Sequence, residues 1–248
     1  MWRMLLIAGA ASVVGLTSAC ATTVTGTPKA ERPQAGSQSA STSAPAPAST
    51  TPPPAVGSVA EADLEGLLLP VEDVQTVMEA PELGVDKTYT EMPPSTVGYI
   101  PEDCASAAYN TVETGYRDSG FTATRGAVMQ EPATAPQLLH VVDEGVVTFP
   151  DATAAAAYVT KTVERWGHCA KSPFTAQRPE SVEHWNFGDL SAVNGINSIP
   201  KTTEGSDWTC SHAITSKANV VVDVSACGFS MADQAANIAG RIRDKIPG

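Results

Sequence analysis

Residues 208–228 read WTCSHAITSKANVVVDVSACG. This stretch predicts two strands, the second rich in valine, joined by a very short polar turn. If Ala218 and Asn219 form a two-residue turn, counting back along the antiparallel pair places Cys210 directly opposite Cys227. Directly opposed side chains have Cβ atoms about 4.5 to 5.5 Å apart, close enough for a disulfide after a small adjustment. The sequence therefore predicts a Cys210–Cys227 bridge across a hairpin.

The remaining cysteines of this region complete a disulfide framework. Four cysteines allow three pairings, and the hairpin register selects one of them, which leaves Cys104 to pair with Cys169. No C-x-x-C spacing occurs, so we expect no zinc site and no other metal. Paired cysteines are typical of an oxidising compartment outside the cytoplasm.

The N-terminus has the layout of an export signal. Arg3 is followed by an apolar run and by small residues up to Cys20, and the run is too short to cross a bilayer. The segment resembles the lipobox of bacterial lipoproteins, although Thr17 stands where that motif prefers leucine. We expect cleavage after residue 19 and attachment of diacylglyceryl and palmitate-type acyl chains to Cys20. Ordinary secretion with an incidental thiol is the alternative.

Residues 20–57 follow as a lipidated N-terminus and a tether. From residue 27 this segment consists mainly of Pro, Ser, Thr, Ala and Gly, a composition that cannot bury a core. We expect one folded domain over residues 58–248, because about 190 residues suffice for one core. Removing Arg3 with the signal leaves 14 basic and 27 acidic residues, a net charge of −13. Such a surface argues against nucleic acid as a partner.

Helix and strand patterns alternate along this domain without a regular β-α-β rhythm. Helices are expected over residues 58–68, 71–78, 101–116 and from Asp151 and Ser230 onward, the first opened by a capping box of Ser58 and Glu61. Strands are expected over residues 121–130, 139–149, 182–187 and 191–199 and in the cysteine hairpin. Short connections imply antiparallel neighbours. The predicted fold class is α+β, a mostly antiparallel sheet packed with helices, with two disulfides and a cleft.

No catalytic motif is evident in the sequence. The four histidines, His140, His168, His184 and His212, lie on separate predicted elements, and a nucleophile elbow, a zinc-protease motif and a phosphate loop are all missing. Ser211 and His212 are adjacent in a strand and therefore point to opposite faces, so they do not form a dyad. We expect a domain that is not an enzyme and needs no cofactor.

A ligand cleft is the functional site that the aromatic residues suggest. Clefts combine apolar walls with a few placed polar groups. Trp185, Asn186, Trp208 and His212 would provide both if the strands bring them together. In the predicted register His212 faces Ser225, which gives this face of the hairpin a semi-polar character around the disulfide. Core packing of the tryptophans and a solvated sheet face are the alternatives.

Three stretches together resemble a known family. They are VVTFPD at residues 146–151, RWGHC at residues 165–169 and VVVDVSACG at residues 220–228. In this respect the chain is similar to the PknH-like extracellular domain, the external sensor module of a mycobacterial receptor Ser/Thr kinase that also occurs on actinobacterial lipoproteins. The resemblance covers residues 58–248 and implies a sheet-and-helix domain with two disulfides and a ligand-binding cleft. No kinase segment accompanies it here.

The expected function is that of a membrane-anchored binding or sensor-like domain on the extracytoplasmic face of the cell membrane. Its partners would be the membrane, through Cys20, and an unknown small molecule or envelope component. The alternatives are a lipid or glycolipid carrier, which needs an apolar cavity, and an envelope hydrolase, which needs a Ser, a His and a carboxylate in contact. An adaptor for a protein partner would instead expose an apolar patch.

Overall fold

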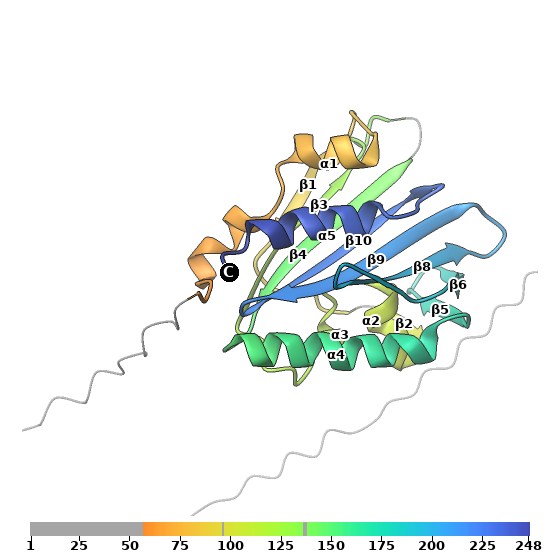
Figure 1. The fold of residues 1–248 in the computed structure, drawn as a ribbon. Helices are drawn as coiled ribbons and strands as arrows, with labels where there is room; N and C mark the ends of the chain where they lie inside the picture. The colour runs from red at the N-terminus through yellow and green to blue at the C-terminus, as the bar shows by residue number, and fades with distance from the viewer. Residues whose placement is uncertain (1–56, 96, 136–137) are drawn as a thin grey trace, which may run out of the picture. The chain divides into compact units, whose positions relative to one another are not determined.

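The computed structural model describes residues 57–95, 97–135 and 138–248 (Figure 1). The predicted signal, Cys20 and nearly all of the tether lie outside these ranges. Residues 51–248 form one compact unit. Within the described ranges, we find no helix whose length and apolar character would let it cross a bilayer.

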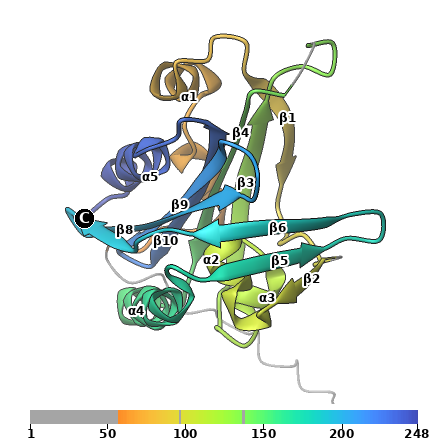
Figure 2. The ribbon, with the colours of Figure 1, turned by 90° about the vertical axis from the view of Figure 1, so that its right-hand side faces the viewer.

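Ten strands of the described chain form one sheet in the order β1-β3-β4-β10-β9-β8-β6-β5-β2, with β7 paired to β8 at one side. Every neighbouring pair is antiparallel, which confirms the predicted fold class. Figure 2 shows that β3 and β4 run almost crosswise to β5 and β6, as expected for a large twisted sheet. The strands are β1 (Gly84–Tyr89), β2 (Gly98–Ile100), β3 (Ala123–Gln130), β4 (His140–Thr148), β5 (Pro173–Gln177), β6 (Val182–Phe187), β7 (Ser191–Val193), β8 (Ile196–Thr203), β9 (Trp208–Lys217) and β10 (Val220–Phe229).

Helices cover both faces of this sheet (Figures 1 and 2). Helices α1 and α5 pack on one face, which we call the α5 face, and α2, α3 and α4 pack on the other, the α4 face. Because side chains alternate along each strand, successive residues serve different cores. The helices are η1 (Glu61–Asp63), η2 (Glu65–Leu67), α1 (Val71–Met78), η3 (Glu102–Cys104), α2 (Ala105–Ala108), α3 (Glu113–Tyr116), α4 (Ala152–Cys169) and α5 (Gln234–Lys245).

The central hairpin has the predicted register. Strands β9 and β10 pair with Cys210 opposite Cys227 and with His212 opposite Ser225. The turn is tight, with Ala218 at φ +49°. The side chain of Asn219 then binds both backbone groups of Val59 and the carbonyl oxygen of Phe149. The turn thus holds the beginning of the domain against the sheet.

The two long helices follow the predicted spacing. Asp151 caps α4, because its Oδ1 accepts a hydrogen bond from the Ala154 backbone N–H at 2.8 Å. The predicted faces are buried in both helices: Ala155, Tyr158, Val159, Thr162 and Trp166 in α4, and Ala235, Ile238, Ala239 and Ile242, with Ile246 just beyond the helix, in α5. Helix α5 begins at Gln234 rather than Ser230, since Ser230 has φ +63° and cannot open a helix.

Two other helix predictions were wrong in detail. Residues 58–68 form two short 3-10 helices rather than one capped helix: the first is capped at Ala60 without a side-chain hydrogen bond, and Glu61 pairs with Arg125 at 3.0 Å. Residues 101–116 form three separate turns, since the chain leaves the helix between α2 and α3, where Thr111 has φ +43°. Long-range hydrogen bonds described below hold this break.

The strand predicted over residues 191–199 is a hairpin. Asn194 and Gly195 both have positive φ, at +52° and +75°, and turn the chain between β7 and β8. Asn-Gly is the dipeptide that such two-residue turns prefer, so the signal was present in the sequence. Three short edge or near-edge strands, β1, β2 and β5, were missed.

Candidate functional site

A buried ion pair lies at the centre of the α4 face. The Nε2 atom of His212 on β9 lies 2.5 Å from Oδ1 of Asp223 on β10, and Nδ1 lies 3.0 Å from the carbonyl oxygen of Ala107. A carbonyl can only accept, so Nδ1 carries a proton. Asp223 accepts two more hydrogen bonds on its other oxygen. The imidazole of His212 is thus held between the backbone of α2 and the carboxyl group on β10.

The second oxygen of Asp223 holds the break between α2 and α3. Its Oδ2 accepts hydrogen bonds from the Thr111 backbone N–H at 2.9 Å and from the Tyr116 hydroxyl at 2.8 Å. Burial, and then the nearby Asp223 carboxylate, raise the pKa of Tyr116 well above its usual value, so the phenol stays a neutral donor. One carboxylate thus connects β10 to the break after α2 and to α3.

A second buried carboxyl extends this network toward β1. Oδ1 of Asp143 on β4 accepts a hydrogen bond from the Tyr89 hydroxyl at 2.8 Å, and that hydroxyl lies 2.7 Å from Oγ1 of Thr111. Asn110 donates to the backbone carbonyl oxygens of Asp143 and Asp223 at 3.0 and 3.3 Å. Burial raises the pKa of Asp143 to about 6.

Two glycines make room for these contacts. Gly126 on β3 and Gly145 on β4 lie directly opposite each other, below the ring of Tyr89. A Cβ atom on Gly126 would lie 2.1 Å from Cζ of Tyr89, and one on Gly145 would lie 2.3 Å from Cγ2 of Thr111. Neither position accepts a side chain unless the network moves.

This network connects elements and does not resemble an exposed catalytic centre. His212 is 2% exposed, and the ring of Trp166 lies over it with centroids 4.4 Å apart. The neighbouring Ser211 belongs to the α5 face, as the alternation predicted. Within the described ranges, no group of three or more His, Cys, Asp or Glu residues has the arrangement of a metal site. The semi-polar face predicted for the hairpin is therefore neither a wet cleft nor a solvated surface at this point.

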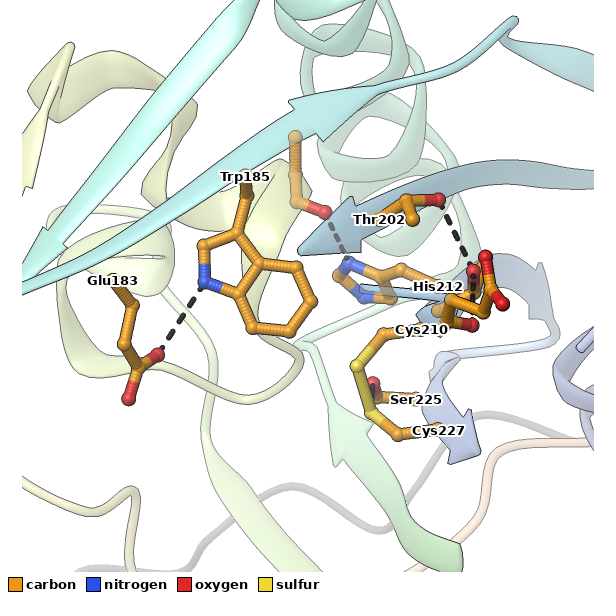
Figure 3. Close-up of a disulfide and its surroundings, with 10 residues drawn as sticks. Glu183, Trp185, Thr202, Cys210, His212, Ser225 and Cys227 are labelled. Carbon is orange, nitrogen blue, oxygen red and sulfur yellow. Dashed lines mark hydrogen bonds between the residues drawn. A yellow bond between two sulfur atoms is a disulfide. The ribbon is translucent and has the colours of Figure 1, made fainter. Parts of the chain in front are cut away.

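Both predicted disulfides are present. Cys104 and Cys169 join η3 to the end of α4, with Cα atoms 5.8 Å apart. Cys210 and Cys227 join β9 to β10 across the hairpin (Figure 3), with Cα atoms 3.9 Å apart. The first bridge fixes the helical layer, and the second fixes the sheet.

A buried lysine lies beside the second disulfide. Lys201 on β8 pairs with Cys210, and its Nζ atom lies 3.7 Å from the ring centroid of Tyr109 and 4.4 Å from that of Trp185. Burial lowers the pKa of Lys201 to about 7, which the nearby carboxylate of Glu183 offsets only in part. Trp185 donates to Oε2 of Glu183 at 3.3 Å (Figure 3).

The four residues predicted to line a cleft occupy different environments. Trp185 is buried in the core of the α4 face, as is His212. Asn186 follows Trp185 on the same strand, so its exposed side chain points to the opposite face. Trp208 is half-buried and packs edge-on against Phe229, with ring centroids 5.3 Å apart. Trp185, Trp208 and His212 thus share the α4 face, while Asn186 is separated from them by the sheet.

Several hollows of ligand size lie elsewhere on the described residues, and three of them exceed 400 Å³. A groove of about 560 Å³ runs between α5 and the β7–β8 hairpin. A pocket of about 460 Å³ lies beside the ion pair of Glu131 and His140, whose atoms are 2.7 Å apart. A third of about 470 Å³ is lined by α2, α3 and Arg165 of α4. Sequence reasoning missed all three, because each combines segments far apart in the chain.

Comparison with known proteins identifies the fold. Residues 59–245 match the family model described as the PknH-like extracellular domain. The serine/threonine-protein kinases PknH of Mycobacterium tuberculosis (strain H37Rv) and of Mycobacterium bovis are each 34% identical over 189 residues, which is 76% of this chain. The match spans only 30% and 31% of those kinases. The crystal structure of the extracellular domain of PknH from M. tuberculosis superposes with a TM-score of 0.73 at 34% identity, over 76% of this chain and 96% of that one. The chain belongs to the PknH-like extracellular domain family.

Proposed function

We propose that this chain is an exported lipoprotein that presents a non-enzymatic binding domain on the extracytoplasmic face of the cell membrane. The observation that carries the proposal is the arrangement of the cysteines. The sequence contains five, and the two disulfides of the fold use four of them. Cys20 is therefore left without a cysteine partner in the chain, directly after a signal-like segment of small residues.

The buried network supports a role without catalysis. A general base must reach a substrate proton, and His212 is enclosed between Trp166 and the sheet. A hydrolase would also need a nucleophile next to this histidine, but the hydroxyl of Ser211 lies on the other face. An extracellular domain of this family then acts by binding, and its ligand is a small molecule or an envelope component.

A lipid carrier is the less favoured form of binding protein. A carrier needs an enclosed apolar cavity for acyl chains. The groove beside α5 instead has hydroxyl, amide and charged side chains among its lining residues, including Ser211, Asn237 and Arg243. The net charge of −13 without the signal also disfavours anionic lipid head groups and nucleic acid.

The anchoring step is tested on the full chain in a bacterial host that processes lipoproteins. Mass spectrometry should find a mature N-terminus at residue 20 that carries acyl chains, and the protein should sediment with membranes. The variant Cys20→Ser keeps the signal and should move the protein to the soluble fraction. A mature N-terminus at another residue, or an unmodified Cys20, would refute the lipoprotein assignment.

The binding step is tested on residues 51–248 with both disulfides oxidised, because these residues form one compact unit. Native mass spectrometry after incubation with an extract of envelope lipids and metabolites should show a retained species. The purified compound should then raise the melting temperature. If nothing is retained while both disulfides are intact, a protein adaptor becomes the better assignment.

A further inference from the structure

The groove beside α5 has the features of a built binding site. It lies on the α5 face and is lined by residues of α5 and of the β7–β8 hairpin. Its volume of about 560 Å³ is within the range that holds small-molecule ligands. Nη1 of Arg243 donates to the carbonyl oxygen of Asn194 at 2.6 Å, so the helix and the hairpin turn are joined at this groove.

Ser211 provides the strongest sign that the groove takes a ligand. The residue is 2% exposed and lies on β9 opposite Pro200, with its side chain on the groove face. Its hydroxyl makes no hydrogen bond to another described residue, and Ser211 lines the groove, where solvent can contact it. Such a hydroxyl can donate to or accept from a ligand hydroxyl, which would replace solvent there.

Two more hydroxyls share this face with Ser211. Ser191 on β7 pairs directly with Ser198 on β8, and their Oγ atoms are 3.4 Å apart. Both line the groove. Asn237, exposed on α5, faces the same hollow. Hydroxyl and amide groups each donate and accept hydrogen bonds, which is the pattern that complements a ligand with several hydroxyl groups.

The charges and the apolar residues narrow the class of ligand. Three aspartates and two arginines line the groove, so its net charge of −1 gives little attraction for a phosphate. The aliphatic side chains of Val193 and Ile196 also line it and offer contacts for C–H groups. We propose that this groove binds a neutral polyhydroxylated ligand, a mono- or disaccharide unit. This goes beyond the proposed function, and lipid attachment at Cys20 does not depend on it.

The test is an NMR titration of ¹⁵N-labelled, oxidised residues 51–248 with glucose, galactose, arabinose and sucrose, each to about 50 mM, which saturates a millimolar site. Saturable shifts should concentrate on β7, β8, the amide of Ser211 and the groove side of α5 from residue 236 to residue 244. Loss of one hydrogen bond in Ser211→Ala should weaken binding about three- to tenfold. Ser225→Ala is the matched control, because Ser225 is also buried, at 9% exposed, on the neighbouring strand but faces α4.

Asn237→Ala is the second variant, in case Ser211→Ala fails to fold. Asn237 is exposed on the helix surface, so this substitution should leave the fold intact and weaken binding by a similar factor. The proposal is overturned if none of the four sugars gives a saturable shift, or if the shifts lie outside the groove. Equal effects of Ser211→Ala and Ser225→Ala would also overturn it. A parallel titration uses inorganic phosphate. If phosphate shifts the groove resonances and the sugars do not, the ligand is an anion and the sugar proposal is wrong.

Discussion

Glu144 should make the protein less stable as the pH rises from weakly acidic to neutral. This residue lies on β4 with its side chain in the apolar core of the α5 face, where it is fully buried. Oε2 accepts a hydrogen bond from the Leu69 backbone N–H at 3.3 Å, and Oε1 has no partner within the described residues. Burial raises the pKa of Glu144 from 4.5 to about 8. The folded protein therefore keeps this carboxyl protonated at pH 7.

The sign of the effect follows from the protons bound in each state. Between pH 4.5 and about 8 the folded state holds a proton on Glu144 that the unfolded state has released, so the free energy of unfolding falls with rising pH. The difference between the two pKa values corresponds to about 5 kcal/mol. Asp143, whose pKa is raised from 3.8 to about 6, adds to the early part of this fall.

Lys201 has the opposite effect at higher pH. Its pKa falls from 10.5 to about 7, so above pH 7 the unfolded state binds a proton that the folded state does not. The free energy of unfolding then rises again toward pH 10.5. The two groups together predict a minimum of stability at about pH 7 to 8.

Urea unfolding followed by tryptophan fluorescence at about pH 5.5, 7.5 and 10 measures this curve. Residues 51–248 are suitable because their four cysteines are all paired. Glu144→Gln should flatten the fall on the acid side and leave the alkaline rise, and Lys201→Met should do the reverse. A wild-type curve without a minimum would refute the reasoning, as would Glu144→Gln with an unchanged acid slope.

Three further variants test the contacts of the α4 face and the hairpin, each by urea unfolding. Gly145→Ala places a Cβ atom 2.3 Å from Thr111 and should cost about 1 to 3 kcal/mol, whereas unchanged stability would mean that the close approach of Tyr89 and Thr111 is wrong. Asp223→Asn leaves His212 without its carboxylate and should cost about 3 to 5 kcal/mol, against little change for the exposed control Asp233→Asn. Replacing Cys210 and Cys227 by alanine opens a 17-residue separation and should cost about 3 kcal/mol; a loss near zero would show that the bridge adds nothing to the strand pairing.

The hairpin could be predicted because its information is local. The alternation of side chains predicts which residues share a face, and the positions of Cys210 and Cys227 predict the strand register. Both signals lie within 21 residues. The break at Asn110 and Thr111 could not be predicted in this way. Residues 101–116 have a helical pattern, and the chain leaves the helix because Asp223 and Asp143, more than 30 positions away, take its polar groups as partners. A tertiary contact overrode a local preference.

The candidate ligand residues show the same limit. Alternation correctly placed Ser211 and His212 on opposite faces, but it cannot say which face a helix covers. Helices α2 and α4 close over His212, so the residue expected in a cleft is buried. Helix α5 does not cover all of the other face, so Ser211 reaches a groove.

The two faces of the β9–β10 hairpin therefore have different roles, because adjacent residues along each strand point to opposite faces. On the α4 face, a disulfide, an ion pair and a helix break hold the sheet to its helices without an opening at His212. On the α5 face, the same strand presents an unpaired hydroxyl to a groove whose edge is a short hairpin. Because the sheet separates them, the proposed binding in the groove would leave the ion pair intact, and the sheet would form the wall of that site.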